Sequence, residues 1–286
     1  MLKILSEQFY REPKTPGSTG RAKRTHTALV TGVSNGIGME FTKILAQNNY
    51  NLVLIDRDRE KIELLKDDLK SNHSVRTTFL IEDLTEAETP SRIYTVLAAQ
   101  NIEIDILINN AGIGAFGKFS ETDWRHEANI LKLNIIALTH LTKLFMKGMI
   151  ERKYGKILNI ASIGAFQAVP LQSVYSASKA YVLSFTEAIA NELEGTGVTV
   201  TALCPGPTAT GFHDAANENG KRRYIPKKMP TAKEVALHGY NAMMKGKHVS
   251  IHGIMNTILI SISRLFPRKL LADLARKKME GHLKDF

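Results

Sequence analysis

Three residues whose types and spacing could do acid–base chemistry lie between positions 162 and 179. Ser162 is followed thirteen residues later by Tyr175, and Lys179 comes four residues after the tyrosine. Residues four apart stack on one face of a helix, so the pattern predicts a phenol beside an ammonium group. Lowering a tyrosine pKa from about 10 to about 7 takes roughly 4 kcal/mol. A cation about 4 Å away supplies roughly that much at an effective dielectric of about 20, so the pair could act as a proton donor.

Two amide-bearing segments precede these residues in the chain. The run N-N-A-G at 109–112 follows an apolar run, and an asparagine there can bridge neighbouring strands through its amide. Its small residues would also let the backbone approach a ligand closely. Asn134 lies in the apolar run L-K-L-N-I-I-A-L. It is either a hydrogen-bonded core residue or part of a site, and this segment alone leaves both alternatives open.

A glycine turn near the first apolar run predicts a phosphate-binding element. The run T-A-L-V (27–30) leads into T-G-V-S-N-G-I-G (31–38), which a helical pattern follows. In such a strand–turn–helix unit, backbone N–H groups at the helix start can face an anion, which the helix dipole favours. The spacing of Gly32, Gly36 and Gly38 departs from the G-x-G-x-x-G fingerprint, so the turn taken alone is a weak signal.

Charged residues after the next two apolar runs bear on which dinucleotide would bind. Asp56 follows the second run, where a carboxylate can accept hydrogen bonds from both hydroxyls of an adenosine ribose and would repel a 2′-phosphate. Arg57 comes next and favours that phosphate, because a guanidinium pairs with it. We weigh the carboxylate above the arginine, so NAD is favoured over NADP. Asp83, followed by Leu84, comes after the third run and is a candidate contact for the adenine edge.

Apolar runs alternate with helical patterns from residue 27 to about residue 251. The alternation predicts an α/β fold, a doubly wound parallel sheet of about seven strands with helices on both faces, in a single domain. Ligands of such sheets bind beyond the carboxyl ends of the strands, and the candidate residues above lie at such ends or in the helices that follow them. The seven expected strands are at 27–30, 51–55, 77–81, 105–108, 156–160, 198–203 and 248–251.

The net charge of +10 is concentrated at the two ends of the chain. Residues 1–24 carry six Lys/Arg against two Asp/Glu, residues 25–220 carry 17 against 22, and residues 221–286 carry 15 against four. The body is therefore mildly acidic, and we expect no nucleic-acid partner for it. A single cysteine, Cys204, excludes an internal disulfide and favours a cytoplasmic location. No Cys/His cluster has the spacing of a zinc site, so no metal is assigned.

Three segments lie outside or interrupt a predicted dinucleotide-binding domain at 25–255. Residues 1–24 are interpreted as a flexible basic extension, since Pro, Gly, Ser, Thr and cations dominate them. The polar stretch at about 208–230 is typical of a substrate lid, and its few apolar side chains hint at an apolar or amphipathic ligand. Residues 256–286 predict basic amphipathic helices that cover the body, pair with another subunit or lie on a membrane surface; the first two alternatives are favoured.

The motifs T-G-x-x-x-G-I-G, N-N-A-G, Y-x-x-x-K and a following P-G resemble those of the short-chain dehydrogenases/reductases, over roughly residues 25–255. The resemblance implies a Rossmann-type sheet and hydride transfer between NAD(P) and a carbonyl or alcohol carbon. It implies that Tyr175 is the general acid/base and that Lys179 lowers the pKa of Tyr175 and binds the nicotinamide ribose. It also implies that Ser162 bonds the substrate oxygen and that Asn134 supports a proton relay. The cofactor-binding positions expected from the motifs are Gly32, Ser34, Asn35, Gly36, Ile37, Gly38, Asp56, Arg57, Asp83, Leu84, Asn110, Ala111, Gly112, Tyr175, Lys179, Pro205, Gly206, Thr208 and Thr210.

The expected partners are a small carbonyl or alcohol substrate and further copies of the chain, as a homodimer or homotetramer. The N-terminal extension departs from the usual family pattern, in which the first strand starts near the chain start. It leaves localisation open between the cytoplasm and a membrane surface. The competing hypothesis is a non-catalytic dinucleotide sensor or scaffold on the same fold, because a fold does not determine a function. A sensor, however, has no need of the four candidate catalytic residues together.

Overall fold

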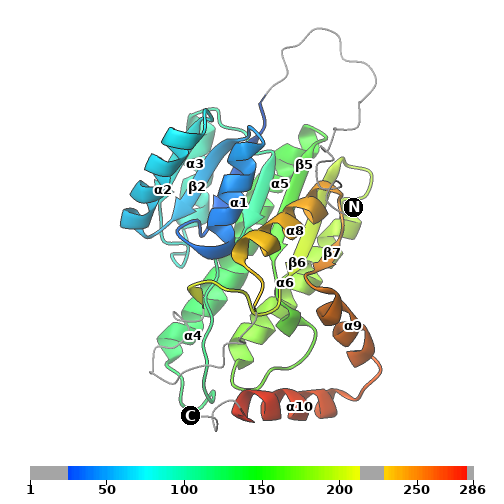
Figure 1. Cartoon of the computed structure of the whole chain (residues 1–286). Helices are drawn as coiled ribbons and strands as arrows, with labels where there is room; N and C mark the ends of the chain where they lie inside the picture. The colour runs from blue at the N-terminus through cyan, green and yellow to red at the C-terminus, as the bar shows by residue number, and fades with distance from the viewer. Residues whose placement is uncertain (1–24, 213–228, 282–286) are drawn as a thin grey trace, which may run out of the picture.

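The computed structural model describes residues 25–212 and 229–281, with a seven-stranded sheet at its centre. Every neighbouring pair of strands is parallel, and the strand order is β3-β2-β1-β4-β5-β6-β7. The chain therefore winds outward twice, once from β1 through β2 to β3 and once from β4 to β7 (Figure 1). The predicted doubly wound sheet is confirmed. The strands are β1 (Thr27–Thr31), β2 (Asn51–Asp56), β3 (Thr77–Ile81), β4 (Ile106–Asn109), β5 (Gly155–Ile160), β6 (Val198–Cys204) and β7 (Val249–Ile251).

Helices cover both faces of the sheet, because alternate side chains of its central strands enter two separate cores. On β1, Ala28 and Val30 pack in one core and Leu29 packs in the other. The first core lies under α1 (Gly36–Gln47), α2 (Arg59–Asn72) and α8 (Ala232–Met244). The second lies under α3 (Thr89–Ala99), α5 (Leu138–Glu151) and α6 (Ser173–Glu192). Burial on both sides explains why these strands read as continuous apolar runs.

Side-chain caps set the start of several helices. A capping box begins α8, since the Thr231 hydroxyl accepts from the Glu234 N–H and the Glu234 carboxylate accepts from the Thr231 N–H. Asp58 caps α2 by accepting a hydrogen bond from the Lys61 N–H. Asp123 caps α4 (Trp124–Leu131) in the same way.

A π-helical turn interrupts the long helix that follows α4. The segment η1 (Lys132–Ala137) lies between α4 and α5. π-Helical turns occur mostly as single insertions in α-helices and often at functional sites. Here the wider turn includes Asn134, which is fully buried.

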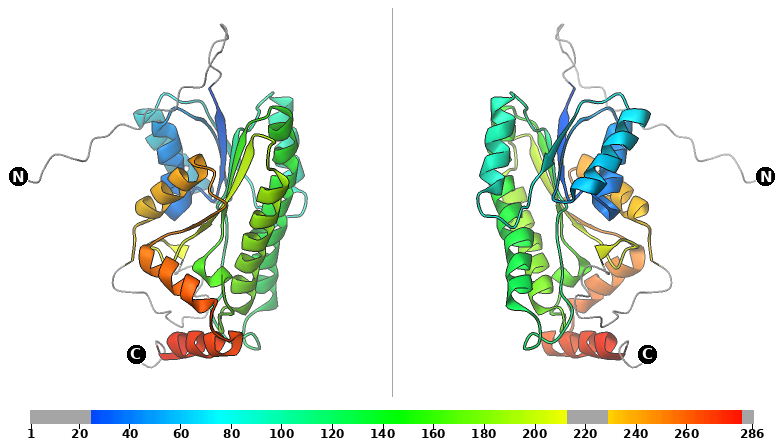
Figure 2. Two further views of the ribbon diagram at one scale, coloured as in Figure 1. Left: turned by 90° about the vertical axis from the view of Figure 1, so that its right-hand side faces the viewer. Right: turned by 90° about the vertical axis from the view of Figure 1, so that its left-hand side faces the viewer.

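The C-terminal helices lie beyond the carboxyl end of the sheet. In Figures 1 and 2, α9 (Ile254–Ser263) and α10 (Arg268–Gly281) are seen below the strands, with α10 crossing under the body. They form the predicted helical appendage. No helix within 25–212 and 229–281 has both the length and the apolar character needed to cross a bilayer. The predicted extension at 1–24 and residues 213–228 of the predicted lid lie outside the described residues.

Candidate active site

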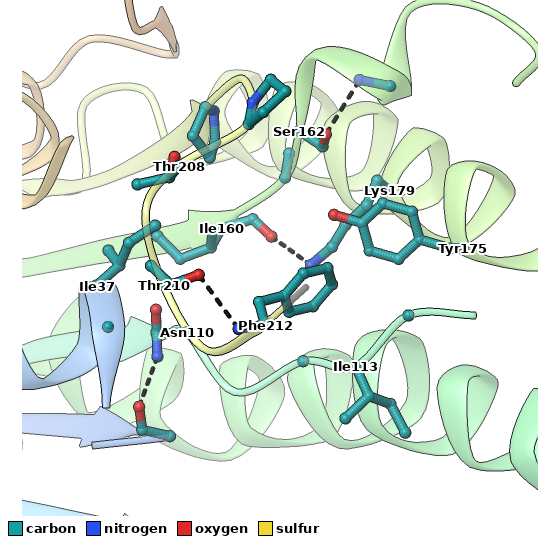
Figure 3. A pocket seen from close by; sticks show the side chains of 18 of the residues that line it. Ile37, Asn110, Ile113, Ile160, Ser162, Tyr175, Lys179, Thr208, Thr210 and Phe212 are labelled. Atoms are coloured by element: carbon teal, nitrogen blue, oxygen red, sulfur yellow. Dashed lines mark hydrogen bonds between the residues drawn. The ribbon is translucent and has the colours of Figure 1, made fainter. Parts of the chain in front are cut away.

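A cavity of about 970 Å³ lies at the carboxyl ends of the strands and collects almost all of the predicted site residues. Only two of them, Gly38 and Asn134, do not line it, and both contact residues that do. Figure 3 shows part of the cavity lining. The predicted residues that line the cavity are Gly32, Ser34, Asn35, Gly36, Ile37, Asp56, Arg57, Asp83, Leu84, Asn110, Ala111, Gly112, Ser162, Tyr175, Lys179, Pro205, Gly206, Thr208 and Thr210.

The glycine turn after β1 brings the start of α1 to the cavity. Gly32 has a φ of +70°, which favours glycine, and a Cβ at Gly38 would collide with the Gly32 carbonyl oxygen. The Asn35 side chain does not cap α1, and the first turn of that helix carries no acidic residue. The N-terminal N–H groups of a helix are a ready anion site when no side chain caps them. The turn therefore fits the pyrophosphate of a dinucleotide.

The N-N-A-G run ties three neighbouring strands together. The Asn110 amide nitrogen donates to the Thr31 carbonyl at 2.9 Å and to the Gly32 carbonyl at 2.8 Å, so it joins the end of β4 to β1. The Asn109 amide nitrogen donates to Asn159 Oδ1 at 2.9 Å and joins β4 to β5. The expectation that asparagine bridges strands here is met by both residues. These bonds hold the backbone that forms the floor of the cavity.

Acids at the ends of β2 and β3 bind a backbone amide and an arginine at one end of the cavity. Asp56 Oδ2 accepts from the Ser34 N–H at 2.9 Å, which links β2 to the glycine turn. Arg57 Nη1 lies 3.6 Å from Asp83 Oδ2. Burial raises the pKa of Asp83, but hydrogen bonds from Thr85 and the charge of Arg57 outweigh burial and lower that pKa overall. Asp83 therefore stays ionised at neutral pH and partly neutralises Arg57.

Tyr175 and Lys179 come from consecutive turns of α6, as their spacing predicted. Lys179 Nζ lies 5.9 Å from the centroid of the Tyr175 ring and donates to the Ile160 carbonyl at 2.8 Å (Figure 3). Only 4% of the Lys179 surface is exposed. Burial lowers the pKa of this ammonium group to about 8. Most molecules therefore keep a positive charge beside Tyr175 at pH 7.

Ser162 follows β5 and faces the same part of the cavity. Its hydroxyl oxygen accepts from the Gly164 N–H at 3.1 Å and so begins the short helix η2 (Ile163–Ala165). That bond uses a lone pair and leaves the hydroxyl hydrogen for another acceptor. Figure 3 shows Ser162, Tyr175 and Lys179 gathered on one side of the cavity. Two hydroxyl donors beside a buried cation suit a site where an oxygen gains negative charge.

Asn134 lies behind the cavity wall and fixes the loop after β4. Its Oδ1 accepts from the Ile113 N–H at 3.1 Å, and its Nδ2 donates to the Ile113 carbonyl at 3.0 Å and to Ser178 Oγ at 3.0 Å. A Cβ on Gly112 would lie 3.1 Å from Asn134 Oδ1 and 3.4 Å from Lys179 Nζ. Asn134 Oδ1 and Lys179 Nζ therefore both lie close to Gly112. Its role in a proton relay stays a prediction.

Sequence reasoning missed parts of the wall that no motif marks. The C-terminal helices contribute Asn256, Leu259, Ile260 and Ser263 from α9 and Ala275, Lys278 and Met279 from α10. A Cβ on Gly206 would lie 2.9 Å from the Asn256 amide nitrogen, so α9 meets the P-G segment directly. The apolar periodicity of these helices predicted that they cover the body, pair with another subunit or lie on a membrane surface. It did not predict a cavity wall, because the same pattern serves a core and a cavity wall.

Phe212 is the last described residue before the gap at 213–228, and its ring faces Tyr175. The two ring centroids are 5.6 Å apart, and a Cβ at Gly114 would lie 3.0 Å from the Phe212 ring. The sequence placed Phe212 in the lid and suggested an apolar ligand contact, but could not pair it with Tyr175. The ring gives the catalytic side of the cavity an apolar wall (Figure 3).

Comparison with known proteins gives consistent relatives in sequence and in structure. A very-long-chain 3-oxoacyl-CoA reductase of Phaeosphaeria nodorum is 34% identical over 206 residues, which are 71% of this chain and 60% of that protein. The chain therefore spans about six-tenths of the length of that relative. A short-chain dehydrogenase of Sphingobium yanoikuyae in complex with NADPH is 27% identical, with a TM-score of 0.75 over 84% of this chain and 94% of the other.

A second solved structure and a family model extend this agreement. A bulky-bulky ketone specific alcohol dehydrogenase of Comamonas testosteroni is 26% identical, with a TM-score of 0.72 over 84% of this chain and 92% of that one. The model of a family described as short chain dehydrogenase matches residues 26–221, which is more than half of the chain. The chain belongs to the short-chain dehydrogenase/reductase family, a family of NAD(P)-dependent oxidoreductases, as its motifs predicted.

Proposed function

We propose that the protein transfers a hydride between the nicotinamide of NAD(P) and a carbonyl or alcohol carbon. The observation that carries the proposal is the meeting of Ser162, Tyr175 and Lys179 in the cavity that the uncapped start of α1 also faces. A dinucleotide sensor would need the uncapped start of α1, but not Ser162, Tyr175 and Lys179 together. The nicotinamide supplies or accepts the hydride when bound, and the chain supplies binding, orientation and the proton.

The chain's own residues act on the oxygen of the substrate. In reduction this oxygen gains negative charge, and the Ser162 and Tyr175 hydroxyls donate hydrogen bonds to it. Tyr175 then gives up its proton as the general acid, and in the reverse direction it accepts one. The Lys179 charge stabilises the phenolate that remains. Asn134 holds the loop that carries Ile113 and supports the return of a proton from solvent.

The dinucleotide would lie along the ends of β1 to β3, with its nicotinamide towards α6. We assign the pyrophosphate to the turn between Gly32 and Gly38, the adenosine ribose to Asp56, and the adenine to Asp83 and Leu84. The nicotinamide end is assigned to Lys179 and to the P-G segment through Thr208 and Thr210, all of which line the cavity. The fit rests on the uncapped helix start and on Gly32 and Gly36, whose positive φ angles shape the turn that lines the cavity.

We expect NAD to bind at least about tenfold more tightly than NADP, because the cations at the adenosine end are already paired. Arg57 lies 3.6 Å from Asp83 and Lys61 lies 2.8 Å from Asp58, while Asp56 adds a negative charge. Tenfold corresponds to about 1.4 kcal/mol, a modest charge repulsion near a protein surface. Titration of both dinucleotides by fluorescence measures the ratio. Asp56→Asn should lower the preference for NAD over NADP, and Arg57→Ala should leave NAD binding unchanged. Tighter NADP binding that Arg57→Ala abolishes would show that the arginine dominates instead.

We propose a ketone with long or bulky apolar substituents as the substrate, including long 3-oxoacyl thioesters and their alcohols. Apolar side chains line the cavity beyond the catalytic residues, among them Ile113, Val169, Phe212, Leu259 and Met279. The names of the Phaeosphaeria and Comamonas relatives point the same way. A panel of ketones with increasing apolar length tests the proposal by the change in reduced nicotinamide absorbance. We expect kcat/KM to rise at least about tenfold for two added methylenes. A preference for the smallest ketones would contradict this class.

We also propose that the protein assembles as a homodimer or homotetramer. Ile136 on η1 and Tyr181 on α6 are exposed apolar side chains on two elements that pack together, and they suit a contact between copies. The proposed catalytic unit is 25–255, with the C-terminal helices as a second wall of its cavity.

A further inference from the structure

The helix α9 carries apolar side chains on the side that faces away from the cavity. Its cavity side consists of Asn256, Leu259, Ile260 and Ser263, at helical spacing. The opposite side carries Ile254, Met255, Ile258 and Ile262, and Leu265 continues it beyond the helix end; we call these five residues the outer face. An ordinary surface helix presents polar residues to water on this side. The outer face therefore lacks a partner among the described residues.

The outer face is part of the largest concentration of exposed apolar side chains in the described residues. More than half of the exposed large hydrophobics lie between residues 254 and 274. Ile254 is 81% exposed and Leu265 is 83% exposed, so these two side chains are mostly hydrated. Exposed apolar side chains gathered in this way mark an interaction surface.

Cations lie near the end of the outer face in the chain, at Arg264 and along α10, and have few acidic partners. Lys269 lies 3.5 Å from Asp273 and Arg276 lies 2.7 Å from Glu280. Arg264, Arg268 and Lys277 have no ion pair with any acid of the described residues. The partner of the outer face must therefore tolerate, and is attracted by, a cluster of positive charge.

The charge of the chain itself argues against the other ways of covering this face. Residues 1–24 and 221–228 are themselves basic and would bring like charges together. A second copy docked by a two-fold axis would set the same cations of both copies against each other. A bilayer with anionic lipids satisfies both features at once, because its acyl boundary takes aliphatic side chains while its headgroups take Lys and Arg.

We propose that the end of the molecule formed by α9 and α10 docks on the surface of an anionic lipid bilayer through the outer face. Figure 2 shows both helices at one extremity, below the sheet, where a flat surface can reach them. The same α9 lines the cavity with its inner side, so docking places one wall of the cavity next to the lipid. The proposal is independent of the identity of the substrate.

The test is co-sedimentation of the full chain with vesicles. We expect binding to vesicles of phosphatidylcholine mixed with phosphatidylglycerol, and at least tenfold less binding to pure phosphatidylcholine or at high salt. The pairs Ile258→Gln with Leu265→Gln, and Arg264→Gln with Arg268→Gln, should each lower binding at least tenfold. Leu64→Gln and Lys70→Gln, exposed positions on α2, are the matched controls and should bind like the wild type.

Further readouts separate loss of docking from loss of structure. The altered residues do not line the cavity, so dinucleotide binding and the circular dichroism spectrum should be unchanged. Light scattering follows the oligomeric state of each variant. The proposal is overturned if the wild type ignores anionic vesicles, if the α2 controls lose as much binding, or if Ile258→Gln with Leu265→Gln dissociates an oligomer and leaves lipid binding unchanged.

Discussion

Replacing Tyr175 with phenylalanine is expected to lower kcat about a thousandfold while dinucleotide binding stays within about twofold. The change removes only the phenolic hydroxyl, and general acid–base catalysis by one side chain contributes about 10²–10⁴ in rate. The ring contacts remain, because Phe212 lies 5.6 Å away and Lys179 Nζ lies 5.9 Å from the ring centroid, and neither contact involves the hydroxyl. Single-turnover oxidation of reduced nicotinamide measures the chemical step, and fluorescence titration measures binding.

Tyr181→Phe is the matched control for this change. Tyr181 lies on the same helix, its hydroxyl is 3.1 Å from Thr139 Oγ1, and it is 39% exposed and outside the cavity wall. We expect Tyr181→Phe, which removes only this hydroxyl, to leave kcat unchanged. If Tyr175→Phe kept activity within tenfold of the wild type, another group would have to donate the proton. A wild type that binds dinucleotide but turns over no ketone or alcohol would support the sensor hypothesis instead.

Replacing Lys179 with methionine is expected to inactivate the protein and at the same time stabilise it. The folded pKa of about 8 lies below the ordinary 10.5, so holding this charge in the dinucleotide-free protein costs about 3 kcal/mol at pH 7. The lost hydrogen bond to the Ile160 carbonyl offsets about 1 kcal/mol of that gain. We therefore expect the free energy of unfolding to rise by about 2 kcal/mol at pH 7. Without the cation beside Tyr175, we expect kcat to fall at least about a hundredfold.

The stability gain should depend on pH in a fixed direction. Between pH 8 and 10.5 the unfolded wild type binds more protons at this position than the folded one, so wild-type stability rises with pH there. The advantage of Lys179→Met is thus full below pH 8 and shrinks as pH approaches 10.5. Urea unfolding across this range measures it, without dinucleotide.

Lys156→Met serves as the control for the stability argument. Burial also lowers the pKa of Lys156, whose Nζ donates to the Met244 carbonyl at 3.3 Å, but this side chain does not line the cavity. Its replacement should shift stability in the same direction and leave kcat unchanged. A Lys179→Met variant that keeps its activity, or that is less stable than the wild type at low pH, would contradict the argument.

The sequence was sufficient where side-chain type and strand register act together. The apolar runs predicted all seven strands, and the five inner strands, β2, β1, β4, β5 and β6, are buried on both faces. Spacing alone placed Tyr175 and Lys179 on one side of α6, since i and i+4 must share a helix face. The amides of Asn109 and Asn110 bridge strands because Asn109 ends β4, at the centre of the sheet, and Asn110 follows it.

The sequence was insufficient where the outcome depends on which distant segments meet. Thr31 opens a motif, yet nothing in its type shows that its hydroxyl accepts from the backbone N–H groups of Asn110 and Ala111. Asn134, in the π-helical turn, bonds to the Ile113 backbone and to Ser178, and neither partner is local in the chain. The meeting of Phe212 with Tyr175 likewise depends on the path of the chain after β6.

The cavity wall comes from two separate stretches of the chain, and this has a consequence for how such proteins diversify. Everything assigned to the dinucleotide and to proton transfer lies before residue 211, whereas the far wall comes from α9 and α10, after Gly253. Gly253 has a φ of +91° and marks where the chain leaves the sheet. The part of the apolar wall that α9 and α10 contribute is therefore separable from the reactive part of the pocket at one point in the sequence. Exchange of the tail after Gly253 among relatives would change which molecules are accepted and leave the reaction itself the same.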